Sequence, residues 1–192
     1  MKRIFGLVAT ALIALSGAIA AADAYDDTVE LFKNSGQSAE FFKNSYGYAV
    51  FPTIGKAGFG VGGAHGKGQV YEQGKYTGDA SVSKLSVGLQ AGGQAYSQII
   101  FFQDKRAFDE FTSGNFEFGA GVSAVAITAS AGAEAGTTGT SAGAAGGKKD
   151  ATTVGKYNKG MAVFTIVKGG AMYEASVAGQ KYSYKARAAP KS

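Results

Sequence analysis

Residues 48–71 read YAVFPTIGKAGFGVGGAHGKGQVY, and this stretch gives the strongest indication of the fold. Its first four residues are rich in β-branched and aromatic side chains, which favours a strand, and Pro52 is expected to end that strand. Glycine alternates with larger apolar residues over 57–61, and the glycines of 65–68 are expected to reverse the chain as a hairpin. The body of the chain is therefore predicted to be mostly β-strand.

More strands are expected further along. Residues 72–75 predict a second turn, and residues 81–89 alternate polar with apolar side chains, as a strand with one wet face does. A Lys-Gly-Gly sequence at 168–170 predicts another hairpin. The remaining expected strands are residues 97–102, 122–127, 161–167, 171–177 and 181–184, the last at a sheet edge.

Short helices are expected at three places. Asp27 followed by Glu30 predicts a capped first helix that Gly36 stops, and residues 39–45 repeat the pattern of the first helix. Asp104 predicts a third helix over 104–113. The predicted fold class is α+β, with short N-terminal helices packed on a strongly curved antiparallel sheet of roughly seven to nine strands, or a partly closed barrel, and one further short helix.

The first 24 residues have the layout of a signal peptide. Lys2 and Arg3 precede an uncharged apolar run, which is followed by Ala22-Asp23-Ala24. A retained membrane anchor is the alternative, but no basic stop-transfer cluster follows. We expect a single domain over 25–187, a flexible Gly/Ala/Ser/Thr loop at 132–153 and a disordered tail at 188–192. The protein is expected to be exported to the periplasm, with peripheral membrane attachment left open.

The composition excludes several classes of function. The chain has no cysteine and one histidine, so disulfides, a lipoprotein anchor and the usual transition-metal clusters are not expected. We expect no cofactor and no metal. The formal net charge of +5 could favour anionic head groups, but it is not concentrated in one cluster, and nucleic acid is not expected as a partner of an exported protein.

Two short motifs suggest chemistry that their context does not support. Residues 58–63 fit G-x-G-x-x-G, but no helix is expected to follow them, as a dinucleotide site requires. Residues 139–143 fit G-x-S-x-G, but they lie in the low-complexity segment, and His65 precedes them. Asp109-Glu110 are expected to be solvated helix charges. We therefore predict that the protein is not an enzyme.

Aromatic side chains among glycine-rich strands could line an apolar cleft for acyl chains, with lysines meeting a head group. The aromatics that look exposed are Tyr46, Tyr48, Phe59, Tyr71, Tyr76 and Tyr96. The alternative is that they are ordinary core aromatics beside solvated lysines. The candidate lipid-binding residues are Lys56, Phe59, His65, Lys67, Tyr71, Lys75 and Tyr96.

Several ordered runs of sequence resemble bacterial SYLF domains. The longest is FFKNSYGYAVFPTIGKAGFGVGG at 41–63, and others stand at 66–71, 92–97, 99–102, 160–164 and 172–175. The resemblance covers nearly the whole chain after residue 24. Such domains are often labelled lipid-binding or actin-binding, and eukaryotic relatives are tied to phosphoinositide membranes and actin filaments.

The resemblance implies a phospholipid or membrane surface as partner, while an exported bacterial protein would meet no actin in its own cell. The alternative is a cell-envelope structural or stress protein that binds protein partners. An integral outer-membrane protein is disfavoured because the last strand ends in Lys185 and a basic tail.

Overall fold

The computed structural model describes residues 23–119, 122, 124–127, 156–169 and 177–188, without the side chains of 58–61, 86–92 and 169. The expected signal peptide at 1–24 therefore lies almost wholly outside the described residues. The expected loop at 132–153 lies outside them altogether. The strand expected at 171–177 and the tail at 188–192 fall almost entirely outside as well.

One long antiparallel hairpin organises the molecule. Strand β1 (Gly47–Glu72) pairs with strand β2 (Lys75–Phe102) over nearly its whole length. The hairpin turn lies at Gln73 and Gly74, both with positive φ, which glycine adopts without steric cost. The turn predicted at 72–75 is confirmed.

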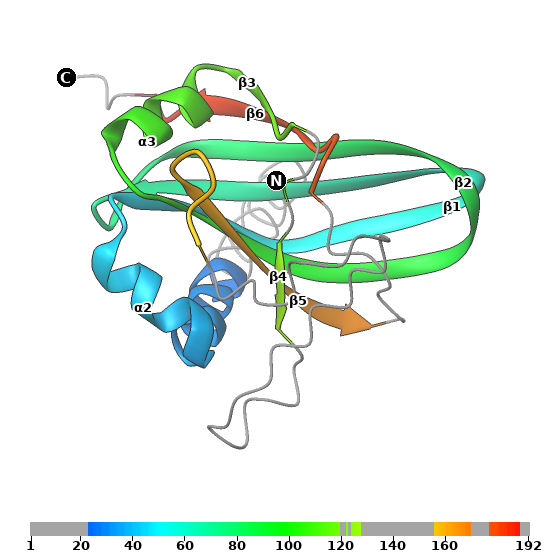
Figure 1. The fold of residues 1–192 in the computed structure, drawn as a ribbon, viewed down its shortest axis with the longest axis horizontal. Coiled ribbons are helices and arrows are strands. Elements are labelled where there is room, and N and C mark those ends of the chain that lie inside the picture. Colours follow the sequence, from blue (N-terminus) through cyan, green and yellow to red (C-terminus); the bar gives the residue numbers. More distant parts are fainter. Residues whose placement is uncertain (1–22, 120–121, 123, 128–155, 170–176, 189–192) are drawn as a thin grey trace, which may run out of the picture.

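Both strands bend sharply near their middle, and Figure 1 shows them turning back together at one end of the molecule. The register explains the bend, because Phe59 pairs with Ala91 while Val61 pairs with Val87. One residue of β1 thus opposes three of β2, and such a bulge bends a ribbon. We call the end of the molecule where both strands turn back the bend end. The near arm is residues 47–57 with 93–102, and the far arm is residues 61–72 with 75–87.

The two arms lie against each other where glycines allow it. A methyl group placed on Gly68 would lie 2.5 Å from the Phe51 ring and 2.8 Å from the carbonyl oxygen of Val50. A methyl group on Gly66 would lie 2.7 Å from Cγ1 of Ile54. The turn predicted at 65–68 is wrong, because these glycines serve close backbone approach within a continuous strand.

Pro52 does not end the first strand either. β1 continues past it through a bulge between Phe51 and Ile54, where Ser97 on β2 donates a 2.7 Å hydrogen bond to the Pro52 carbonyl. A bulge accommodates the missing proline N–H without ending the ladder. The several strands expected over 48–102 are therefore two continuous ones.

The other strands pair with different arms of β2. Strand β5 (Met161–Gly169) pairs with the near arm and β6 (Lys181–Ala186) with the far arm. Strand β3 (Asn115–Glu117) flanks β6, so the expectation of β6 as an edge strand is wrong. Strand β4 (Val125–Ile127) pairs with β5 in parallel, so the sheet is mixed and not purely antiparallel.

The described strands form one six-stranded sheet in the order β3-β6-β2-β5-β4, with β1 paired to β2. This order does not return to its start within the described residues, so the sheet is curved but open. The α+β fold class is confirmed.

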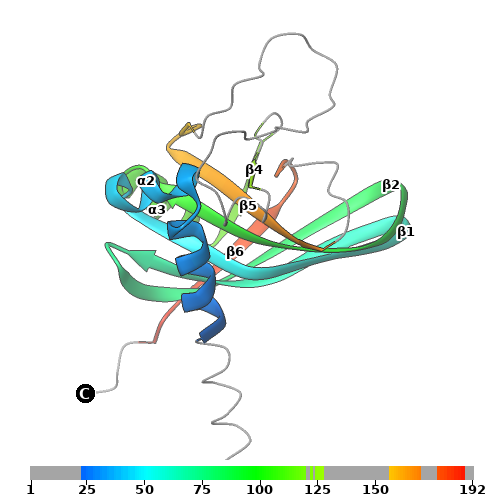
Figure 2. The same cartoon turned by 90° about the horizontal axis from the view of Figure 1, so that it is seen from below.

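Two helices cover one face of the near arm and β5. Residues 23–33 are helical, so Asp27 lies inside this helix and does not cap it, and helix α2 (Gly36–Asn44) begins at the glycine expected to stop the first helix. Phe41 packs against Phe164, with ring centroids 4.9 Å apart, and Phe42 packs against Phe101 at 4.8 Å. Figure 2 shows both helices along the same side of the sheet.

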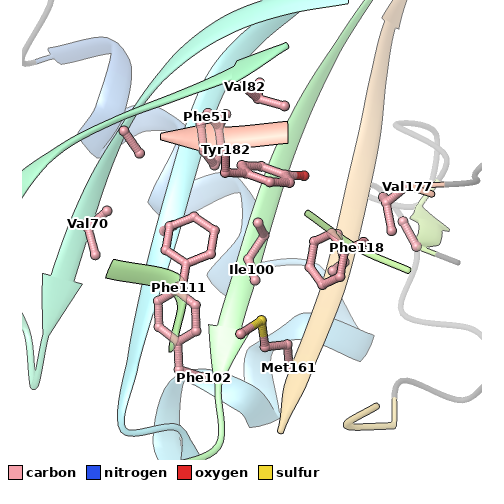
Figure 3. Close-up of a cluster of buried hydrophobic side chains, with 14 of the residues drawn as sticks. Phe51, Val70, Val82, Ile100, Phe102, Phe111, Phe118, Met161, Val177 and Tyr182 are labelled. Carbon is pink, nitrogen blue, oxygen red and sulfur yellow. The ribbon is translucent and has the colours of Figure 1, made fainter. Parts of the chain in front are cut away.

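The opposite face carries the larger core. Helix α3 (Lys105–Thr112) is capped as predicted, with the Asp104 side chain accepting a 2.8 Å hydrogen bond from the amide of Ala107. Its buried residue Phe111 packs on Phe102 and on Tyr182 of β6. Figure 3 shows these rings between the two arms, with the Tyr182 hydroxyl pointing toward β5.

Candidate functional site

A small polar cavity lies between the two arms near the bend end. Its volume is about 20 Å³, somewhat more than the roughly 10–15 Å³ that one water requires. The near arm, the far arm, β5 and the residue before β6 all contribute to its wall. The lining residues are Lys56, Ala64, Lys84, Gln94, Tyr96, Thr165 and Gln180.

The register of the strands brings these side chains to one face. Lys56 pairs directly with Gln94 across the near arm, and Ala64 pairs with Lys84 across the far arm. Thr165 pairs with Gln98, two residues from Tyr96 on the same face of β2. Directly paired residues share a face of a sheet, so each arm presents its lining side chains on one face. The bend of the hairpin then brings these two faces together around the cavity.

Buried amides and hydroxyls form the floor beneath the cavity. Gln180 donates a 3.1 Å hydrogen bond to the hydroxyl of Tyr96 and accepts one from Gln98 at 3.2 Å. The Tyr182 hydroxyl bonds with both glutamines. All four of these side chains are buried. Because each buried polar group needs a partner, this network holds Tyr96 and Gln180 in fixed orientations.

Two hydroxyls are left with hydrogens to donate. Tyr96 accepts from Gln180, and the described residues provide no acceptor for its own proton. Thr165 is 1% exposed, and its Oγ1 atom has no hydrogen-bond partner among the described residues. Burial raises the pKa of Tyr96 to about 12, although the hydrogen bond from Gln180 opposes the rise. Tyr96 is therefore a neutral donor at physiological pH.

Basic side chains surround the mouth of the cavity. Lys56 and Gln94 also line a shallow open depression that continues along the near arm to Lys168. Lys168 donates a 3.3 Å hydrogen bond to Thr53. Within the described part of the chain, neither Lys56 nor Lys168 forms an ion pair. The cavity wall itself contains no carboxylate.

An exposed apolar side chain lies on the opposite face of the far arm from Lys84. Leu85 follows Lys84 on β2 and is 78% exposed. Its partner across the far arm is Gly63, which offers no side chain to cover it. A large exposed leucine is a feature of surfaces that meet membranes or apolar partners.

The candidate residues from the sequence do not form one site. Lys56 and Tyr96 line the same cavity. His65 and Lys67 are exposed on the far arm, and Lys75 is exposed beside the hairpin turn.

The two remaining candidates are both aromatic. Tyr71 stacks on Tyr48 and belongs to the core under the N-terminal helices. The backbone of Phe59 lies in β1 at the bend, and its side chain is outside the described part. Of the aromatics expected to be exposed, Tyr96 is buried, because the bent hairpin and Gln180 cover it.

Sequence reasoning missed most of the cavity wall. Lys84 lies in the strand that was correctly predicted from the alternation at 81–89. The sequence did not show which other strand this face of the strand would meet. Gln98, Thr165 and Gln180 are buried polar residues that stand inside or beside apolar runs of the sequence. A polar residue within an apolar run was the sequence signal that could have predicted the buried polar network.

Two features are absent from the described ranges. No three His, Cys, Asp or Glu side chains gather closely enough there to hold a metal ion. No helix in the same ranges combines the length and apolar character needed to cross a membrane.

These features define an α+β domain built on one long bent hairpin, with a basic polar cavity between its arms. The chain belongs to the Ysc84 (SYLF) family, whose model, described as Las17-binding protein actin regulator, matches residues 83–189. It is also 30% identical over 158 residues to the beta cell expansion factor A of Aeromonas veronii. That alignment covers 80% of this chain and 51% of the relative, so the chain spans about half the length of that protein.

Proposed function

We propose that the protein binds anionic phospholipid surfaces through its bend end. The observation that carries this proposal is that Lys56, Lys84 and Lys168 line one cavity and the depression that continues from it, while Leu85 is exposed on the other face of the far arm. Each basic residue near an anionic bilayer contributes about 1 kcal/mol of attraction, and an inserted leucine adds a hydrophobic term. The family supports a binding role of this general kind.

Vesicle flotation tests this function. Vesicles of phosphatidylcholine with phosphatidylglycerol are expected to carry the protein upward at low salt, while vesicles of phosphatidylcholine alone carry little. Binding is expected to weaken as salt rises, because screening shortens the range of the attraction. If the protein stays at the bottom with anionic vesicles at low salt, the proposed function is wrong.

Charge-reversed variants locate the surface. The double variant K56E/K168E is expected to bind anionic vesicles at least about thirtyfold more weakly, which corresponds to about 1 kcal/mol for each lysine removed. The matched control is K33E/K43E, which makes the same charge change on the N-terminal helices, where both lysines are exposed and pair with glutamates. Equal losses in the two variants would show that net charge, and not the bend end, governs binding.

A protein partner is the second candidate function. The description of the family model, Las17-binding protein actin regulator, names a protein as binding partner, and this favours a protein-binding surface. The same bend end could serve, because Leu85 is exposed there. Photo-crosslinking from position 85 in intact cells separates the two functions: discrete protein adducts support this candidate, and lipid adducts alone support the first.

We also propose that the protein acts outside the cytoplasm, in the periplasm, and that it binds without catalysis. Lys2, Arg3 and the apolar run that ends at Ala24 support export. The single histidine and the lack of cysteine support a non-catalytic role. The intact mass of protein from the periplasmic fraction tests export, and the expected first residue is Tyr25.

A further inference from the structure

Donors converge on the cavity between the arms from several directions. Tyr96 and Thr165 line it from β2 and β5, and Lys56, Lys84 and Gln94 line it from both arms of the hairpin. None of the lining side chains carries a negative charge. A wall of hydroxyl and ammonium donors without a carboxylate fits an anion and opposes a cation.

Thr165 supplies an independent indication of a ligand. A buried hydroxyl without a partner costs about 1–3 kcal/mol, and valine would fill the same space at no such cost. The Oγ1 atom of Thr165 is in this condition among the described residues, and Thr165 lines the cavity. An oxygen of a ligand in the cavity would satisfy this hydroxyl.

The size of the cavity limits what can enter. A volume of about 20 Å³ holds one oxygen atom of a larger group, since a water needs roughly 10–15 Å³. The rest of the anion must remain at the mouth, where Lys56 and Gln94 continue into the open depression. A tetrahedral group suits this arrangement, because it directs one oxygen inward while its other oxygens face the lysines.

We propose that this cavity is a subsite for a single phosphate group, with one oxygen bonded to Tyr96 and Thr165 and the others facing Lys56 and Lys84. The inference rests on the proposed function, because the expected source of the phosphate is the head group of an anionic phospholipid. Free inorganic phosphate presents the same chemistry and is distinguished by experiment.

The test compares Thr165→Val and Tyr96→Phe with the unaltered protein. Thr165→Val replaces the hydroxyl with a methyl group of similar size, and Tyr96→Phe removes the hydroxyl and keeps the ring. Affinity for inorganic phosphate is measured by NMR titration, and affinity for vesicles of phosphatidylcholine with phosphatidylglycerol by flotation. Each variant is expected to bind about tenfold more weakly, the loss of one hydrogen bond to a charged group.

Thermal unfolding separates binding from folding. Thr165→Val is expected to unfold at the same or a higher temperature without ligand, because it removes a buried hydroxyl that lacks a partner. The control is Thr77→Val, which removes a hydroxyl that donates a 3.1 Å hydrogen bond to Val70. The control is expected to lose stability and to keep its affinity for both probes.

The outcomes distinguish the subsite from the proposed function. Weaker binding of both probes by Thr165→Val supports a lipid phosphate in the cavity. Weaker binding of inorganic phosphate with unchanged vesicle binding supports the subsite with free phosphate as its source. Unchanged binding of both probes by Thr165→Val and Tyr96→Phe overturns the subsite and leaves membrane binding intact. Failure of the unaltered protein to bind either probe overturns both.

Discussion

Replacing Gly68 with alanine tests the contact that folds the hairpin onto itself. The new methyl group would lie 2.5 Å from two ring atoms of Phe51 and 2.8 Å from the carbonyl oxygen of Val50. Carbon atoms normally approach to about 3.5–4.0 Å, so the two arms must separate by about 1 Å. Phe51 and Val50 are fully buried, and neither can move into solvent.

The cost follows from two opposing effects. Overpacking of this kind costs about 1–3 kcal/mol. Alanine recovers about 0.5–1 kcal/mol, because glycine loses more backbone freedom when a strand forms. The expected net loss is about 1–2 kcal/mol in the free energy of unfolding. For a domain of this size, that loss lowers the melting temperature by roughly 2–8 °C.

Urea denaturation measures the loss. Tyrosine fluorescence and far-ultraviolet circular dichroism can both follow unfolding, because the chain contains ten tyrosines and no tryptophan. The control is Gly55→Ala in the same strand, where a methyl group would meet no atom within 4 Å. This control is expected to be unchanged or up to about 1 kcal/mol more stable.

Comparison of Gly68→Ala with Gly55→Ala shows whether the two arms are in contact at Gly68. If Gly68→Ala and Gly55→Ala have the same urea midpoint and the same denaturant dependence, the two arms do not approach as closely as described. The explanation of the continuous strand at 65–68 would then be wrong. A lower midpoint for Gly68→Ala alone supports it.

Two further predictions concern stability. Asp104→Ala removes the cap of α3 and should lower the free energy of unfolding by about 1 kcal/mol; Asp109→Ala, which breaks an exposed pair, should cost less than half as much, and equal losses would contradict the capping role. Burial raises the pKa of Tyr96 to about 12 and that of Tyr182 well above 10. Each of these tyrosines therefore contributes fully to the free energy of unfolding below pH 10. Above pH 10 the unfolded chain loses the proton first, so this contribution falls as pH rises toward 12, by about 1.4 kcal/mol per pH unit for each tyrosine. Urea midpoints between pH 8 and 11.5 check this, and Tyr96→Phe should flatten the decline.

Local patterns gave reliable predictions where neighbouring residues determine the structure. The turn at 72–75 and the Asp104 cap depend on a few adjacent residues, and both are confirmed. The alternation over 81–89 correctly indicated a strand. The same patterns misled at 65–68, because glycine permits a turn and a close backbone approach equally well.

The candidate site was predictable only in part. Lys56 and Tyr96 were found because an aromatic and a lysine near glycines suggested a cleft. Lys84, Thr165 and Gln180 were missed, because they come from distant parts of the chain and meet only when the hairpin bends.

Composition, periodicity and ordered local runs were enough to predict the α+β class, the main strand-forming segments and the resemblance to the family. The tertiary structure decided which glycines turn the chain and which bring strands together. It also decided which polar side chains share a cavity. Three residues of β2 oppose one of β1 at the bend, and this two-residue excess folds the two arms face to face. No local pattern reports which residues such a fold will place in contact.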